Sequence, residues 1–162
     1  IKAMPKVLKE FPEAKLHLLG DGFQRPNLEA LAKDIGIRSS VIFHRSVPYE
    51  QLPAFYKNCR VFCRPGLSEG FSPSTLEAAA SGRPVVTTTT FGADGSVAEG
   101  VTGFNVPPAD SDALADALIK ILSDYELTCR MSAEARKKAE REYDRNVIAK
   151  KYYEVYLEAM GG

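Results

Sequence analysis

Two glutamates flank a short loop of small and polar residues near the middle of the chain. Glu69 lies within this loop, and Glu77 lies shortly after it in the sequence. An ionised carboxylate carries only hydrogen-bond acceptors, so beside an anionic phosphate it is better suited to hold hydroxyl groups than the phosphate itself. Two sugar rings would offer such hydroxyls. The alternative is that Glu69 is a loop charge and Glu77 a solvated helix residue.

The loop leads into a segment with strong helix signals. Ser72 is a good N-cap, and Pro73 fits the first helical position because no amide donor is needed there. Residues 76–80 have high helix propensity, and Gly82 favours a left-handed stop. The loop would therefore place several backbone amides and a helix N-terminus at one point. That geometry attracts phosphate oxygens.

The chain around this unit alternates between apolar, β-branched runs and amphipathic segments. Strands are expected at residues 14–19, 40–44, 60–64, 84–88 and 103–106. Nearly continuous apolar strands that alternate with helices favour a parallel sheet covered on both faces. The sequence thus predicts an α/β, three-layer Rossmann-like domain with a mainly parallel sheet, whose ligand chemistry lies at the carboxyl ends of the strands.

The periodicity of apolar residues also predicts the helices. They are expected at residues 1–11, 27–35, shortly after Pro48, from Ser72 to about Ala80, from Asp110 or Ser111, at 125–142 and at 146–160, with a short helix and turn at 97–103. The last helix is expected to turn one apolar face toward the domain, formed by Ile148, Tyr152, Val155, Tyr156 and Ala159.

Composition limits the class of protein. The 162 residues are expected to form a single domain over 1–162, and Lys plus Arg equals Asp plus Glu at 21 each, so net charge gives no sign of a nucleic-acid partner. The three cysteines and two histidines do not have zinc-site spacing, and no metal is expected; His17 is interpreted as a hydrogen-bonded strand residue. Reduced cysteines, together with no signal peptide and no apolar run of membrane-spanning length, favour a cytoplasmic protein.

One cluster of basic residues lies in the expected helix at 125–142. Its members are Arg136, Lys137, Lys138 and Arg141, interspersed with glutamates. Such a pattern is most often a solvated helix face. The alternative is peripheral contact of a longer parent protein with a membrane surface.

Residues 69–77, EGFSPSTLE, resemble the two-glutamate motif of the group 1 glycosyltransferases, retaining enzymes with two Rossmann-like domains in the GT-B arrangement. Further segments follow the order and spacing of that family's C-terminal domain. These are Gly20-Asp21-Gly22, Val41-Ile42-Phe43, Val47-Pro48-Tyr49, Leu52 with Tyr56, Ala78 to Val86, and Gly100 to Phe104. The resemblance covers almost the whole chain.

The resemblance implies the donor-binding half of an enzyme that moves a sugar from a nucleotide diphosphate sugar to an acceptor hydroxyl, with retention and without a metal or cofactor. It implies that Glu69 is the catalytic residue, which holds hydroxyls of the donor sugar, and that Glu77 holds the ribose hydroxyls. The remaining donor-binding residues would be Gly70, Phe71 and Ser72 through their amides, Ser74 and Thr75 by the diphosphate, and Arg45 beside the base.

Several features depart from the family pattern. Arg45 stands where a glycine is common, and Phe91-Gly92 and Gly95 replace a pair of glycines followed by a glutamate. The opening strand, the acceptor-binding domain and an arginine and lysine pair for the diphosphate would fall before Ile1. We therefore expect a domain truncated at its N-terminus that transfers no sugar alone.

Two other functions are weighed against this one. The chain could instead be a stand-alone or engineered Rossmann-like module that binds nucleotide weakly or not at all, without catalysis. A hydrolase is disfavoured, because GFSPS lacks the second glycine of a nucleophile elbow.

Overall fold

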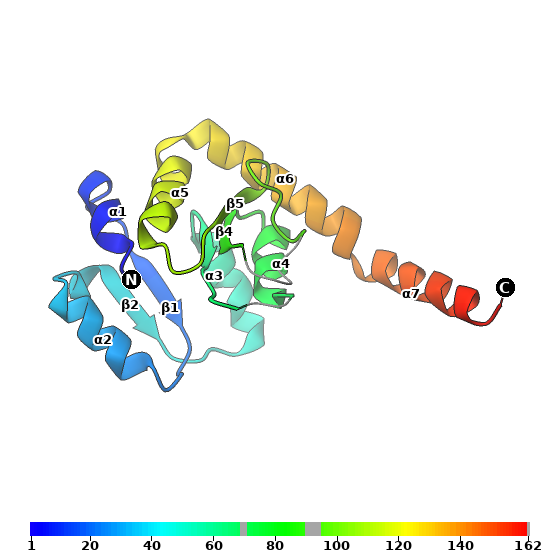
Figure 1. The fold of residues 1–162 in the computed structure, drawn as a ribbon, viewed down its shortest axis with the longest axis horizontal. Coiled ribbons are helices and arrows are strands. Elements are labelled where there is room, and N and C mark those ends of the chain that lie inside the picture. Colours follow the sequence, from blue (N-terminus) through cyan, green and yellow to red (C-terminus); the bar gives the residue numbers. More distant parts are fainter. Residues whose placement is uncertain (69–70, 90–94, 162) are drawn as a thin grey trace.

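The computed structural model describes residues 1–68, 71–89 and 95–161, and Figure 1 shows strands alternating with helices through most of this part of the chain. The strands are β1 (Leu16–Leu19), β2 (Val41–His44), β3 (Phe62–Arg64), β4 (Val85–Thr88) and β5 (Gly103–Val106). Each ends at the residue predicted from the sequence and begins at most two residues later than predicted. The predicted α/β class is confirmed.

All strand pairs are parallel, as predicted. β1 pairs with β2, with Leu16 opposite Val41, while β3, β4 and β5 form a second sheet with β4 at its centre. Among the described residues, β1 and β3 do not pair with each other, so the strands form two sheets rather than one. The carboxyl ends of paired parallel strands share one edge of their sheet, which is where ligand sites form in such folds.

The helices have the following bounds: α1 Met4–Glu10, α2 Arg25–Asp34, α3 Leu52–Asn58, α4 Pro73–Ala80, α5 Ser111–Ser123, α6 Tyr125–Tyr143 and α7 Arg145–Ala159. Short 3₁₀ turns, η1 and η2, occur at Arg38–Ser40 and Tyr49–Gln51. Asp110 is the N-cap of α5, because its carboxylate accepts hydrogen bonds from the amides of Asp112 and Ala113.

The central strand β4 separates two helical layers. Val86 packs in the main core with residues of α1 and α5, whereas its neighbour Val85 packs with Tyr56 of α3 and Ala78 of α4. This alternation is the period of two expected of a strand covered on both faces. Figure 1 shows α5 and α4 on opposite sides of β3, β4 and β5, which is the predicted three-layer arrangement.

The expectation of a short helix at residues 97–103 is wrong. Here the chain forms a turn in which Gly100 has a φ of 70° and Glu99 makes an isolated parallel bridge with Gly103. The Thr102 hydroxyl accepts a hydrogen bond from the Ala98 amide at 2.8 Å, and the Glu99 carboxylate accepts one from the Asn105 amide at 2.7 Å. These side chains satisfy backbone amides locally, so the segment forms no helix.

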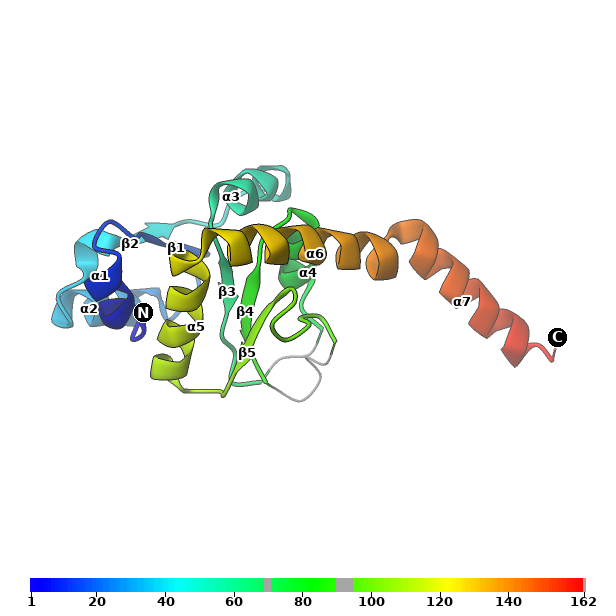
Figure 2. The same cartoon turned by 90° about the horizontal axis from the view of Figure 1, so that it is seen from above.

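The expectation of an inward face on α7 is also wrong. None of its residues is buried, and Tyr152, Val155 and Tyr156 are exposed. Figures 1 and 2 show why: α7 continues beyond α6 and extends away from the rest of the domain, and α6 is its main contact. Among the described helices, none is long and apolar enough to cross a membrane.

Candidate functional site

The first turn of α4 has the predicted position but a different cap. Ser72 has the extended backbone of an N-cap, and its carbonyl accepts hydrogen bonds from the amides of Thr75 and Leu76 at 3.2 and 3.4 Å. Its hydroxyl does not cap the helix. It lies 3.0 Å from the hydroxyl of Ser74, within hydrogen-bond distance. The helix start therefore presents a pair of linked hydroxyls beside the positive end of the helix dipole.

Side chains near this helix start differ in burial. Thr75 is buried, with 1% of its surface exposed, whereas Ser72 and Ser74 are only partly buried. Phe71 is exposed, and its ring lies 5.7 Å from that of Tyr143. Of the three predicted hydroxyl residues, Ser72 and Ser74 are thus the ones that an anion could reach through their side chains.

Glu77 is half-buried and is held by a tyrosine from α3. The Tyr56 hydroxyl donates a hydrogen bond to Glu77 Oε2 at 2.8 Å. Burial and this hydrogen bond raise the pKa of Tyr56. The charge of Glu77 and a hydrogen bond to it also raise the pKa of Tyr49, which lies in η2. Tyr56 is therefore the phenol that holds the Glu77 carboxylate.

The turns that follow β1 and β2 are joined by an ion pair. Arg25 Nη1 lies 3.0 Å from Asp21 Oδ1 and donates to the His44 carbonyl at 2.9 Å. The second oxygen of Asp21 accepts a hydrogen bond from the Ser46 amide at 2.9 Å. This contact fixes the turn that carries Arg45, whose side chain is exposed. A small hollow beside it is lined by residues that include Gly20, Gly22, Arg25 and Phe43.

Two histidines lie together on β1 and β2. His17 Nδ1 and His44 Nε2 are 2.9 Å apart, with their rings stacked, and the Phe55 ring packs edge-on against His44. Burial and the charge of His44 lower the pKa of His17. The hydrogen-bonded interpretation of His17 is confirmed. In the part of the chain that the structure describes, no group of three His, Cys, Asp or Glu residues could hold a metal ion.

The predicted donor-site residues are only partly within the described structure. Glu69, Gly70, Phe91 and Gly92 lie outside the described residues. Arg45 and Glu77 come from different segments. Helix α3 connects them, because it follows the Arg45 turn through η2 and its Tyr56 bonds to Glu77. The structure thus brings the start of α4, Glu77 and the turn after β2 into one region.

Sequence reasoning gave no role to Arg25 or Tyr49. The sequence feature that could have pointed to Arg25 is the Gly-Asp-Gly turn before it. For Tyr49 that feature is its place in the Val-Pro-Tyr segment. Arg25 bonds to residues distant in the chain, and the pKa of Tyr49 is raised by the charge of distant Glu77; periodicity reveals neither.

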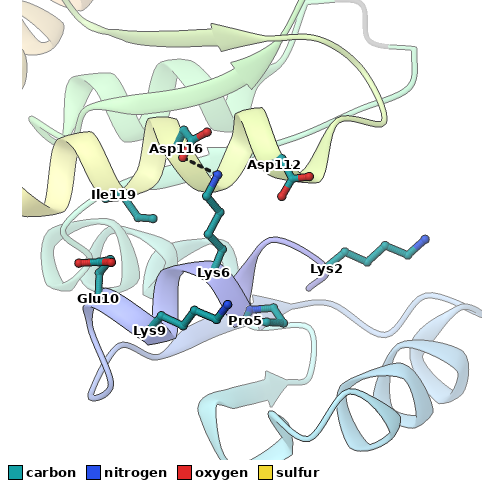
Figure 3. A pocket seen from close by; sticks show the side chains of 8 residues that line it. All are labelled: Lys2, Pro5, Lys6, Lys9, Glu10, Asp112, Asp116 and Ile119. Carbon is teal, nitrogen blue, oxygen red and sulfur yellow. Dashed lines mark ion pairs between the residues drawn. The ribbon is translucent and has the colours of Figure 1, made fainter.

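A second hollow lies between α1 and α5, away from these residues (Figure 3). Three lysines and three carboxylates line it, and Lys6 forms an ion pair of 2.7 Å with Asp116 across it. The opposite charges balance, and no predicted donor-site residue lines this groove. We therefore do not place the site there.

The basic cluster of α6 is paired with acidic side chains. The pairs are Arg136 with Glu140, Lys137 with Glu134, and both Lys138 and Arg141 with Glu142. Mixed, mutually paired charges are typical of a solvated helix face. They favour that interpretation of the cluster over contact with a membrane surface.

Comparison with known proteins identifies the class to which this fold and site belong. Residues 1–138 match the family described as "Glycosyl transferases group 1". A D-inositol 3-phosphate glycosyltransferase from Corynebacterium urealyticum is 35% identical over 96% of this chain and 38% of its own length. The chain belongs to the group 1 glycosyltransferases and corresponds to the C-terminal, Rossmann-like domain of their GT-B fold.

Solved structures share the fold. A sucrose-phosphate synthase from Thermosynechococcus elongatus superposes with a TM-score of 0.87 at 25% identity, over 99% of this chain and 42% of that one. Anabaena Alr3699/HepE, solved in complex with UDP, superposes with a TM-score of 0.84 at 23% identity, over 97% of this chain and 45% of that one. The chain thus spans about two fifths of the length of the relatives it matches.

Proposed function

We propose that this chain is the donor-binding part of a glycosyltransferase that moves a sugar from a nucleotide diphosphate sugar to an acceptor hydroxyl, with retention. The observation that carries the proposal is the arrangement of Glu77, which lies beyond the accessible helix start at Ser72 and Ser74 with its Oε2 bonded to Tyr56. This combines an anion-attracting helix end with a carboxylate suited to hydroxyl groups. The UDP bound by the related fold of HepE supports the same ligand class.

The roles of the residues follow from their chemistry. The end of α4 and the hydroxyls of Ser72 and Ser74 would stabilise the negative charge that builds on the departing diphosphate. Thr75 is buried, so its contribution would come through the helix end rather than its hydroxyl. Glu77 would accept hydrogen bonds from the ribose hydroxyls.

The other proposed contacts surround this position. Glu69 would hold donor-sugar hydroxyls, Gly70 and Phe71 would offer backbone amides, and Arg45 would lie beside the base. We propose that no metal or cofactor takes part.

The cellular place of the protein is a separate proposal. Cys59, Cys63 and Cys129 are free, which supports a cytoplasmic location because such compartments keep thiols reduced.

The division of roles between the two glutamates gives the principal test. Glu77→Gln is expected to weaken nucleotide binding about tenfold or more, since an acceptor oxygen becomes an amide donor. Glu69→Gln is expected to spare the bare nucleotide and weaken only the nucleotide sugar. Titration calorimetry with UDP, GDP and their sugar conjugates, on this chain and on its longer parent, measures both effects.

Glu126→Gln, an exposed substitution in the first turn of α6, is the matched control and should change nothing. Equal effects of the Glu77 and Glu69 substitutions on nucleotide and nucleotide sugar would reject the division of roles. If neither substitution has an effect, both glutamates are surface charges that take no part in donor binding.

We also expect the 162-residue chain alone to transfer no sugar. Orienting donor and acceptor together can lower a barrier by roughly 7–11 kcal/mol, and we propose that the partner domain of the parent supplies this orientation. The measurement is release of nucleotide diphosphate from a nucleotide sugar offered with acceptors. Turnover by purified chain would contradict the expectation and show that this domain alone is catalytic.

A further inference from the structure

The turns that leave β1 and β2 are tied together by one aspartate and one arginine. Asp21 lies in the first turn, and its two carboxylate oxygens have different partners. Its Oδ1 accepts from Arg25 Nη1 at 3.0 Å, and its Oδ2 accepts from the Ser46 amide at 2.9 Å. Asp21 therefore bridges the start of α2 and the turn after β2. Because both oxygens are bonded within the protein, we expect Asp21 to act through this turn and not on a ligand directly.

The guanidinium of Arg25 holds the same turn by a second route. Its Nη1 donates to the His44 carbonyl at 2.9 Å and its Nη2 to the Phe43 carbonyl at 3.3 Å. These are the last two residues of β2. A planar guanidinium serves several acceptors at fixed angles, whereas the ammonium of a lysine is a compact point charge. The shape of the Arg25 side chain, and not its charge alone, is therefore suited to this position.

The segment that is held in this way has no regular structure of its own. Residues 45–48 lie between β2 and η2, outside any helix or strand. The Ser46 amide is satisfied by the bond to Asp21. Arg45, whose side chain is exposed, is the residue before Ser46. The position of Arg45 thus depends on Asp21 and, through Asp21, on Arg25.

We propose that Asp21 and Arg25 are positioning residues for nucleotide recognition, which hold the turn at residues 44–46 so that Arg45 lies against the base of the donor. The inference rests on the proposed function, in which Arg45 lies beside the base. A guanidinium stacks on a flat ring or donates to acceptor oxygens, and both contacts require a defined position. Asp21 and Arg25 would then govern affinity for the nucleotide part of the donor and leave the transfer step unchanged.

Both residues should therefore affect donor binding. Asp21→Ala should weaken UDP or GDP binding about fivefold, because the Ser46 amide and Arg25 lose their shared acceptor. Arg25→Lys should weaken it by a similar factor although the positive charge is retained, because an ammonium does not reproduce the fork of contacts. In the longer parent, both variants should raise KM for the nucleotide sugar and leave kcat nearly unchanged.

A double-mutant cycle tests whether these residues act through Arg45. Arg45→Ala should itself weaken binding, and Asp21→Ala should add almost nothing to that loss, because the side chain that it positions is absent. Asp116→Ala, which removes the carboxylate that pairs with Lys6 at 2.7 Å, is the matched control and should leave affinity unchanged. Calorimetry on the longer parent measures the affinities, and circular dichroism checks that each variant is folded.

A second readout needs no ligand. In the 162-residue chain, the Ser46 amide should exchange hydrogen faster in Asp21→Ala than in wild type, because its acceptor is lost. The rate in Asp116→Ala should equal that of wild type. Nuclear magnetic resonance resolves this single amide.

The outcomes are distinguishable. An equal loss from Asp21→Ala with and without Arg45, or full affinity in Arg45→Ala, would overturn the positioning role. Wild-type affinity in Arg25→Lys, or an unchanged Ser46 exchange rate in folded Asp21→Ala, would also overturn it. Arg25→Lys combined with Arg45→Ala completes the cycle if Asp21→Ala does not fold. Failure of the wild-type parent to bind UDP, GDP or their sugar conjugates would overturn the proposed function and this inference together.

Discussion

At the scale of single residues, the groups that surround a carboxylate decide what it can still bind. Glu142 accepts hydrogen bonds from Lys138 and Arg141, and these cations hold its pKa below the ordinary value. Its charge is thus compensated within α6. Glu77 instead accepts its hydrogen bond from the neutral phenol of Tyr56. A carboxylate held by one neutral donor has further lone-pair positions that can accept from hydroxyl groups.

A second residue-scale consequence concerns His17 and pH. Its pKa in the folded protein is below the ordinary 6.5, so as pH falls past about 6.5 the unfolded chain takes up a proton before the folded chain does. Stability is therefore expected to be highest above that pH and to fall as pH drops toward the lower folded pKa. Urea unfolding at several pH values between about 7.5 and 5.5 measures this slope.

His17→Gln should flatten the slope, because the group that changes protonation is gone. His44 lies against His17 and shares its hydrogen bond, so His44→Gln is the companion variant. An identical pH slope in wild type and His17→Gln would contradict the assignment to this pair.

At the scale of elements, the sequence predicted those features that depend on local signals. All five predicted strands ended where expected, because runs such as Val85 to Thr88 are apolar or β-branched and mark the strand in the sequence itself. The helix expected at 97–103 failed because Thr102 and Glu99 bond to nearby backbone amides and Gly100 has a positive φ. Local propensity alone does not reveal such competition.

The candidate site could be predicted from the sequence less completely than the strands could. The start of α4 and Glu77 could be found from motif and residue type. The contacts of Arg25 with the turn after β2, and of Tyr56 with Glu77, could not, because they join residues far apart in the chain.

Packing between β4 and β5 gives a prediction for Gly103. A Cβ at this position would lie 1.8 Å from the Val85 carbonyl oxygen, a backbone atom of the paired strand that cannot rotate away. Gly103→Ala is therefore expected to destabilise the fold by at least about 2 kcal/mol. Urea unfolding followed by circular dichroism measures the change.

Gly22→Ala is the matched control, since a Cβ there would meet nothing within 4 Å. Its effect should stay within about 0.5 kcal/mol. Equal stability of the two variants would show that β5 does not approach β4 as closely as described.

At the scale of the whole molecule, the C-terminal helix α7 contributes no residue to the hydrophobic core. The main cluster joins residues of α1, α2, β2, β4, β5, α5 and α6, and it includes Met131 of α6, which is 1% exposed. Helix α7 begins after the Asp144 cap and contributes no buried residue. Helix α4, which carries the proposed donor-site features, packs instead on two smaller clusters that include its Ala78 and Ala79. It lies beside the strands, whereas α7 extends away from them (Figures 1 and 2).

This separation predicts that α7 adds little to the stability of the isolated chain. Removal of residues 145–162 should change the free energy of unfolding by no more than about 0.5 kcal/mol, as for surface changes away from packed features. Met131→Ala should cost about 2–5 kcal/mol, because it opens a cavity in the core. Urea unfolding of the two variants measures both values. Hydrogen exchange of the intact chain gives an independent readout, because the amides of α7 should exchange much faster than those of α5. A loss on truncation as large as that of Met131→Ala, or strong exchange protection in α7, would show that this helix packs on the domain in solution.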